Sequence, residues 1–343
     1  MLNTAEVNLF REKTPLTLEL RTVSTEKGPS KGSYDVIIAG AGIAGLTAAL
    51  YSARYGMKTL VVYKDFGKTA TAGIIEDYPG IISTTGEELS NRLLKQVSAY
   101  KVPMSLEILE DVKRSFEEEF KVITSNGEYN ARTVILAVGA ERRKLGVPGE
   151  TEFLGKGVSY CAVCDAPLFK GKTVVVVGGG DTAVKEAMHL AYYARKVYIV
   201  HRRNQLKAMP IMLEKLEDYS NIELILSRRV VGIFGQEVVK GVILDNGEKL
   251  AVDGVFVSIG LRPPVELFKR IGLKVDEKGY VVVNSAQMTS IKGIFAAGDC
   301  TNACNKFHQL VTAAAQGAVA ADSAYKLILE KYGKTLLSKG TYR

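Results

Sequence analysis

The sequence predicts an α/β protein with parallel sheets, and three observations carry this prediction. Short apolar runs rich in β-branched residues alternate with alanine- and leucine-rich stretches, as in parallel sheets covered by helices. Two glycine-rich loops each follow such a run, and the spacing from Gly40 to Tyr63 equals that from Gly178 to His201. Glycine supplies 33 of 343 residues, above the usual ~7%, which indicates close approach of the backbone to a ligand.

Each glycine-rich loop lies inside a strand–loop–helix–strand unit. A buried parallel strand is expected wherever a short, mostly β-branched run ends in glycine. The first unit is predicted to comprise a strand at 34–39, a helix at 46–55 and a strand at 59–63, and the second a strand at 173–177, a helix at 182–194 and a strand at 196–200. Two such units imply two nucleotide-binding sites.

Further strands and one long helix complete the predicted α/β organisation. Three more apolar runs end in glycine and are expected to be strands, at 133–138, 254–259 and 293–299. An alanine-rich helix is expected over 309–329. Residues 1–33 are polar and weakly patterned, so we interpret them as an N-terminal extension that ends in a linker.

Composition excludes several classes of protein. At roughly 150 residues per domain, 343 residues suggest two domains, and a 47% hydrophobic content argues against disorder. Four cysteines are too few for a disulfide-rich secreted scaffold. No apolar run approaches the ~20 residues of a membrane span, and no signal peptide is recognisable, so we expect a cytoplasmic protein. The net charge of +8 comes from scattered residues and is typical of a solvated surface.

The two glycine loops have the pattern of dinucleotide-binding turns. Gly40-Ala41-Gly42-Ile43-Ala44-Gly45 is a full G-x-G-x-x-G, and the second loop has Gly178, Gly180 and Ala183 at the same spacing. In such loops the first glycine makes the tight turn, the second admits a pyrophosphate and the third lets helix and strand pack closely. The pyrophosphate then lies at a helix N-terminus, where free N–H groups favour an anion.

The residues that end the second strand of each unit suggest different nucleotides. His201 is followed by Arg202, Arg203 and, further on, Lys207. A cationic cluster at this position suits a 2′-phosphate, which predicts NADPH rather than NADH. The first unit has Tyr63 and Lys64 where an acid usually binds a ribose. We still expect flavin adenine dinucleotide (FAD) there, with ribose recognition that differs from the usual pattern.

A cysteine pair precedes the second unit. Cys161-Ala162-Val163-Cys164 allows a small disulfide ring, and one thiolate can then attack a partner disulfide while the other resolves it. The adjacent Asp165 is a candidate proton relay. The alternative is a Cys₄ zinc site completed by Cys300 and Cys304, although these two are better interpreted as buried or regulatory thiols or, as a minor option, a second disulfide. The three histidines predict no metal cluster, and His189 is expected to be structural.

With these motifs in place, the sequence resembles the low-molecular-weight thioredoxin reductases of bacteria and archaea. The resemblance covers roughly residues 34–330 and rests on the two glycine loops, on Cys161-Ala162-Val163-Cys164-Asp165, on His201-Arg202-Arg203 and on Gly298-Asp299. Its most specific part is the position of the cysteine pair inside the pyridine-nucleotide domain.

The resemblance implies a homodimer with two Rossmann-like dinucleotide-binding domains in each chain. A discontinuous FAD domain, 34–144 and 262–343, would enclose an inserted NADPH domain, 145–261. Asp299 would bind the flavin ribityl chain and Gln309 would contact the flavin ring. Cys164 would face the flavin, Cys161 would attack the substrate and Asp165 would be the general acid and base. The expected FAD residues are Gly40, Gly42, Ile43, Ala44, Gly45, Tyr63, Lys64, Lys68, Asp77, Gly139, Gly298, Asp299, His308, Gln309 and Leu310. The expected NADPH residues are Gly178, Gly180, Asp181, Thr182, Ala183, His201, Arg202, Arg203 and Lys207.

The sequence departs from this family at three positions of the expected sites. The Gly-Gly-Gln that follows the second strand in the family is Phe66-Gly67-Lys68 here. The arginine before the helix-opening glutamine is His308, and the last arginine of His-Arg-Arg-x-x-x-Arg is Lys207. Lysine keeps the charge of arginine but lacks its bidentate fork. A weaker preference for NADPH is therefore one expectation, and use of both NADPH and NADH is the alternative.

The resulting hypothesis is electron transfer from NADPH through FAD to the Cys161–Cys164 disulfide and on to a thioredoxin- or glutaredoxin-like protein. The nicotinamide and the cysteine pair cannot both reach one flavin face, which predicts rotation of the domains about hinges at 139–144 and 260–264. Alternatives within the class are a ferredoxin-fed reductase, a reductase of peroxiredoxin- or glutaredoxin-like proteins, and a dithiol oxidase. A flavin-bearing sensor or nucleic-acid-binding protein is a more distant alternative that rests only on the positive charge.

Overall fold

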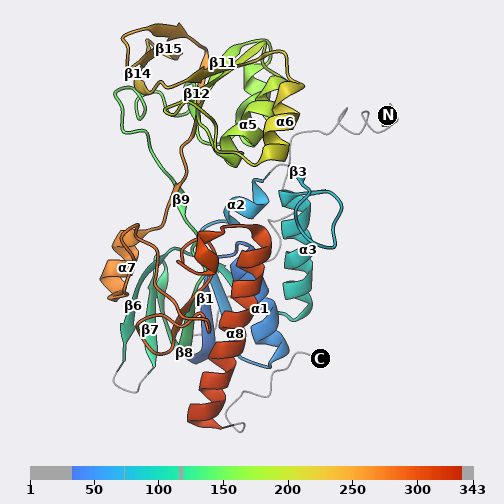
Figure 1. The fold of residues 1–343 in the computed structure, drawn as a ribbon. Coiled ribbons are helices and arrows are strands. Elements are labelled where there is room, and N and C mark those ends of the chain that lie inside the picture. Colours follow the sequence, from blue (N-terminus) through green and yellow to red (C-terminus); the bar gives the residue numbers. More distant parts are fainter. Residues whose placement is uncertain (1–32, 73, 116–118, 334–343) are drawn as a thin grey trace.

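The structure, a computed structural model, describes residues 33–72, 74–115 and 119–333. Two sheet-based units lie one above the other and are joined by a narrow connection (Figure 1). This connection contains the short strands β9 (Glu141–Arg142) and β18 (Leu261–Arg262), which pair antiparallel. The predicted N-terminal extension lies outside the described residues except for Ser33, which begins β1.

The first unit, which is the lower one in Figure 1, contains a seven-stranded sheet. Its order is β5-β2-β1-β8-β7-β6, with β19 also paired to β8. Strands β5, β2, β1, β8 and β19 run parallel, whereas β7 and β6 form an antiparallel edge. The strands are β1 (Ser33–Ala39), β2 (Thr59–Tyr63), β5 (Met104–Leu106), β6 (Leu109–Arg114), β7 (Phe120–Thr124), β8 (Gly127–Leu136) and β19 (Ile294–Ala296).

Helices cover both faces of this sheet. On one face α1, α3 and α8 bury an apolar cluster with β1, and on the other α7 and the segment after it form a second cluster. The helix α8 begins with a capping box between Gln309 and Thr312, which satisfies two free N–H groups of its first turn. The helices are α1 (Ile43–Arg54), α2 (Gly67–Ala70), α3 (Gly86–Ala99), α7 (Val265–Ile271) and α8 (Leu310–Tyr332), accompanied by β3 (Ile74–Ile75), β4 (Thr84–Thr85) and the 3₁₀ turn η4 (Cys304–Lys306).

The second unit has a parallel five-stranded sheet in the order β10-β17-β11-β12-β13. Helices pack on one face of it, and a three-stranded antiparallel sheet, β14-β15-β16, packs on the other. The strands are β10 (Val158–Ser159), β11 (Thr173–Gly178), β12 (Lys196–His201), β13 (Ile222–Leu226), β14 (Val230–Gly235), β15 (Val239–Leu244), β16 (Lys249–Ala251) and β17 (Gly254–Ser258). The helices are α4 (Ala162–Asp165), the 3₁₀ turn η3 (Ala166–Phe169), α5 (Asp181–Ala191) and α6 (Pro210–Glu217).

The α/β fold class with parallel sheets is therefore confirmed, and every strand expected from an apolar run is present within six residues of its predicted ends. The first sheet takes strands from both sides of the second unit in sequence, because β19 inserts beside β8. The antiparallel sheet β14–β16 was not expected. The domain boundaries at 144/145 and 261/262 stay predictions, and they fall beside or within the paired β9–β18 connection.

Candidate active site

The loop between β1 and α1 is shaped for a pyrophosphate. Gly40 has φ +113°, a left-handed conformation that side chains rarely adopt. A Cβ at Gly45 would overlap the carbonyl oxygen of Gly40, so helix and strand approach closely only with glycine there. Gly42 is the N-cap of α1, with open space where a Cβ would be and no acidic residue in the first turn of the helix. The cradle thus fits an anion held by backbone N–H groups.

This loop opens into a cavity of about 2360 Å³ that lies between the two units. Fourteen of the fifteen residues expected to bind FAD line it, and the remaining one, Gly45, is buried behind the loop. The lining set is Gly40, Gly42, Ile43, Ala44, Tyr63, Lys64, Lys68, Asp77, Gly139, Gly298, Asp299, His308, Gln309 and Leu310. The sheet order brings residues from before and after the second unit in sequence to the carboxyl ends of the parallel strands. This is the end of the sheet at which α/β proteins bind nucleotides.

Three residues at and after the end of β2, Tyr63, Lys64 and Lys68, have partners in this cavity. The Nζ atom of Lys68 lies 2.5 Å from Oδ2 of Asp299. Lys64 pairs with Glu141 of β9 at 3.0 Å. Tyr63 occupies the position of the usual ribose-binding acid, and its ring lies 5.0 Å from that of Phe66 in a tilted arrangement. An aromatic pair therefore stands at the end of β2 in place of a carboxylate.

The second glycine loop is built in the same way. Gly180 is the N-cap of α5 and has an extended backbone. The carboxylate of Asp181 accepts a hydrogen bond from the backbone N–H of Met209 at 2.7 Å, which fixes the loop before α6. Of the residues expected to bind NADPH, Thr182 alone lines the large cavity, and the others lie after the carboxyl ends of the neighbouring strands β11 and β12 and at the start of α5.

The end of β12 suits a phosphorylated ribose. The imidazole of His201 packs against Gly179, and its buried Nε2 atom has no hydrogen-bond partner among the described residues. Desolvation, then the charges of Arg203 and Arg202, lower the pKa of His201. Both arginines and Lys207 are exposed, and the backbone N–H of Lys207 donates to the carbonyl of Gly179 at 2.6 Å. The three solvent-facing cations beside His201 fit a 2′-phosphate.

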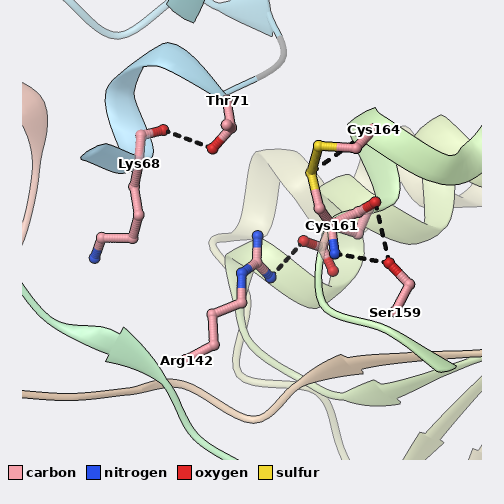
Figure 2. Close-up of a disulfide and its surroundings, with 7 residues drawn as sticks. Lys68, Thr71, Arg142, Ser159, Cys161 and Cys164 are labelled. Carbon is pink, nitrogen blue, oxygen red and sulfur yellow. Dashed lines mark hydrogen bonds and ion pairs between the residues drawn. A yellow bond between two sulfur atoms is a disulfide. The ribbon is translucent and has the colours of Figure 1, made fainter. Parts of the chain in front are cut away.

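Cys161 and Cys164 form a disulfide at the start of α4, with Cα atoms 5.4 Å apart (Figure 2). Cys161 is the N-cap of this short helix, and its sulfur accepts a hydrogen bond from the backbone N–H of Cys164 at 3.2 Å. Ser159 holds the Cys161 backbone, since its Oγ accepts from the N–H at 2.9 Å and donates to the carbonyl at 3.3 Å. A thiolate on Cys161 would be stabilised by the same N–H.

The two sulfurs have different surroundings. Cys161 is half-buried and lines the cavity between the units, whereas Cys164 is exposed. Asp165 is half-buried at the end of α4 and lies outside the cavity lining. In this arrangement Cys164 faces solvent, so its expected contact with the flavin requires the second unit to move. The roles of Cys164 and Asp165 stay predictions.

A partly buried ion pair beside the disulfide was not predicted from the sequence. Arg142 of β9 donates to the carboxylate of Glu186 on α5 at 2.7 Å, and the hydroxyl of Ser258 donates to the other carboxylate oxygen. Desolvation raises the pKa of Glu186, although Arg142 and Ser258 act against the shift. A sequence signal existed, because Glu186 lies among the inward-facing residues of an otherwise apolar helix face.

A second ion pair links the two units across the cavity. Lys215 of α6 lies 3.1 Å from Glu76, which follows β3 in the first unit. Both side chains are about half exposed, so the pair is worth at most about 1 kcal/mol.

The other two cysteines do not join a shared site. Cys300 is fully buried, and desolvation raises the pKa of its thiol to about 12. Cys304 is exposed, and both thiols are free. Across the described residues, no group of three or more His, Cys, Asp or Glu side chains is placed to hold a metal ion, so the Cys₄ zinc alternative has no support there.

His189 lies in α5 as expected and also lines the cavity. Over the residues that the structure describes, no helix has the length and apolar character needed to cross a bilayer.

Two dinucleotide cradles and a disulfide define a nucleotide-dependent disulfide oxidoreductase. The chain belongs to the pyridine nucleotide-disulphide oxidoreductase family, whose pattern matches residues 34–318. The thioredoxin reductase of Bacillus subtilis is 39% identical over 307 residues, which cover 87% of this chain and 95% of that protein. The thioredoxin reductase of Listeria innocua is 40% identical over 307 residues, with 87% and 94% covered. This membership supports binding of FAD and NADPH.

Solved structures fall into two groups by overall similarity. Lactococcus lactis thioredoxin reductase in its FR conformation gives a TM-score of 0.83 at 36% identity, with 87% of this chain and 99% of that chain covered. Thermoplasma acidophilum thioredoxin reductase gives 0.81 at 36% identity, with 86% and 98% covered. The Streptococcus pyogenes enzyme gives only 0.58 at 35% identity, although 88% and 100% are covered. Sequence identity does not account for this difference.

Proposed function

We propose that this protein is a thioredoxin reductase that passes electrons from NADPH to the disulfide of a thioredoxin-like protein. One observation carries the proposal. The Cys161–Cys164 disulfide belongs to the second unit, and Cys161 lines the same cavity as the glycine loop of the first unit. Thioredoxin reductases of several bacteria are about 40% identical over almost their whole length, which supports the same conclusion.

The chemistry of the chain itself is thiol–disulfide exchange. Bound FAD supplies the transfer of a hydride equivalent, two electrons and a proton, from NADPH to the disulfide. Its arrival breaks the Cys161–Cys164 bond and leaves one thiol and one thiolate. The hydrogen bond from the N–H of Cys164 favours the thiolate on Cys161. This thiolate attacks the partner's disulfide to form a mixed disulfide, and the partner's leaving sulfur takes up a proton, for which Asp165 is the proposed donor.

Cys164 then completes the cycle. Its thiol first gives up its proton, and the resulting thiolate attacks the Cys161 sulfur of the mixed disulfide. This restores the Cys161–Cys164 bond, and the departing partner sulfur takes up a proton, so that the partner leaves as a dithiol. Its exposed position allows this attack while the partner is docked. One NADPH and one proton are consumed for each partner disulfide reduced.

We propose that the second unit rotates about the β9–β18 connection between two arrangements. The segments 139–144 and 260–264 contain this pair of strands, which lies in the narrow connection between the units (Figure 1) and makes one ion pair with each of them. In one arrangement Cys164 faces solvent, as it does here, and in the other it would face the flavin. The spread of TM-scores from 0.83 to 0.58 at nearly constant identity supports this interpretation.

The decisive experiment changes each cysteine of the pair singly. We expect Cys161→Ser and Cys164→Ser to retain FAD and its reduction by NADPH but to lose thioredoxin reduction at least about 1000-fold. Cys304→Ser is the matched control, because this thiol is exposed and lies outside the pair. Anaerobic titration with NADPH should consume about two equivalents per wild-type subunit and one per Cys161→Ser subunit. Normal thioredoxin reduction by Cys161→Ser would refute the proposed function.

The preference for NADPH over NADH, the cytoplasmic location and the homodimer belong to the same proposal. Lys207 keeps the positive charge but lacks the bidentate fork of arginine, so Lys207→Arg should raise the ratio of kcat/KM for NADPH over NADH severalfold. An unchanged ratio would place phosphate recognition on Arg202 and Arg203 alone.

The proposed homodimer is tested by light scattering coupled to size-exclusion chromatography, which should detect a species of twice the 37.2 kDa chain mass.

A further inference from the structure

Lys68 and Asp299 meet at the floor of the cavity although they are far apart in sequence. Lys68 belongs to α2, which follows β2, and Asp299 lies in the turn after β19. Their charged atoms are 2.5 Å apart, and the side chains are 38% and 19% exposed. Among the described residues, neither group has a second salt bridge. The residue at position 68 is glutamine in the family that the sequence resembles, so a full positive charge here is a feature of this chain.

The groups that line the cavity around Lys68 determine what its positive charge does. Gly42 and Gln309, the N-caps of α1 and α8, line the same cavity. Two other cations that line this cavity are already committed, since Lys64 pairs with Glu141 and Arg142 with Glu186. Without Lys68, the carboxylate of Asp299 would stand unbalanced at this place. A partly buried carboxylate without a counter-ion opposes any further negative charge nearby.

Reduction of FAD bound in this cavity would add such a charge, because a hydride carries two electrons and one proton to a neutral flavin ring. A nearby cation favours this product and an unbalanced anion disfavours it. We propose that Lys68 is a positioning residue that balances the charge of Asp299 and thereby raises the reduction potential of the bound FAD. This inference rests on the proposed function, because it requires FAD in the cavity.

The test isolates the flavin from the disulfide. Full-length protein carrying Cys161→Ser and Cys164→Ser is loaded with FAD and titrated anaerobically against a reference dye, so that the flavin alone is reduced. Lys68→Gln should lower the two-electron equilibrium constant for reduction about tenfold, which corresponds to about 30 mV. Lys68→Arg, the matched control, keeps the charge and should stay within about threefold of the parent.

A second variant should shift the equilibrium constant for flavin reduction in the opposite direction. Asp299→Asn leaves Lys68 unbalanced and should raise the equilibrium constant about tenfold, while the double variant with Lys68→Gln should return close to the parent. A purely structural role for the pair predicts weaker FAD binding in both single variants without opposite shifts in potential. Equal potentials in parent and Lys68→Gln, or shifts of the same sign in both variants, would overturn the inference. A wild-type protein that does not take up FAD at all would instead refute the proposed function.

Discussion

Replacing Arg142 by methionine tests the buried ion pair beside the disulfide. The side chain of Glu186 is 8% exposed and relies on Arg142 and Ser258 for its hydrogen bonds. Burial already raises the pKa of Glu186, and Arg142 is the strongest influence that acts against this shift. Arg142→Met therefore raises the pKa of Glu186 further, and the folded variant prefers the protonated carboxyl.

The magnitude follows from proton linkage. A carboxyl of the unfolded chain ionises near pH 4.3, so keeping it protonated at pH 7 costs about 4 kcal/mol at about 1.36 kcal/mol per pH unit. Leaving the buried Glu186 carboxylate charged without its partner costs about 3–5 kcal/mol. Protonating Glu186 at pH 7 therefore costs about as much as keeping it charged. Because the folded-state pKa is raised, the stability of the variant falls as the pH increases from 4.5 towards 7. The expected loss relative to wild type is at most about 1 kcal/mol at pH 5 and at most about 3–4 kcal/mol at pH 7, because the raised pKa of Glu186 already costs the wild type part of this energy.

Urea unfolding of the full chain, followed by far-ultraviolet circular dichroism at pH 5, 6 and 7, measures this dependence. The matched control is Arg143→Met, since Arg143 is an exposed neighbour in the same connection and its side chain donates to a backbone carbonyl, that of Leu261, instead of a buried carboxylate. The control should lose less than about 1 kcal/mol at every pH. If Arg142→Met loses no more stability at pH 7 than at pH 5, the assigned coupling between Arg142 and Glu186 is wrong.

Three other perturbations test separate parts of the molecule. Gly45→Ala places a methyl group on a backbone carbonyl of the first glycine loop, so the affinity of the apoprotein for FAD should fall at least about tenfold in a fluorescence titration; unchanged affinity would contradict the close packing. Lys215→Glu puts a second carboxylate beside Glu76 and should widen the arrangement of the units in small-angle scattering at low salt but not at high salt; identical profiles would dismiss the contact. Because burial raises the pKa of Cys300 to about 12, iodoacetamide at pH 8 should label exposed Cys304 at least about 100-fold faster, as read by peptide mass spectrometry; similar rates would contradict this burial.

Local patterns were sufficient for much of the fold. An apolar run, a glycine loop and a helix lie within one short stretch of chain, and their conformations depend mainly on neighbouring residues. The two dinucleotide units, their equal spacing and the cysteine pair were therefore recognisable before any contact was known. The sheet β14–β16 was missed because the glycines inside β14 and β15 resemble turn signals as much as strand interiors.

The sequence by itself determined the two nucleotide cradles, the disulfide-forming cysteines and the basic cluster at the end of β12, because each of these needs only residues that are close in the chain. The tertiary structure alone decided which charges meet. Asp299 reaches Lys68 because β19 inserts into the first sheet, and Arg142 reaches Glu186 because the β9–β18 connection passes beside α5. Such pairs depend on the order of strands and the packing of helices, which no local pattern encodes.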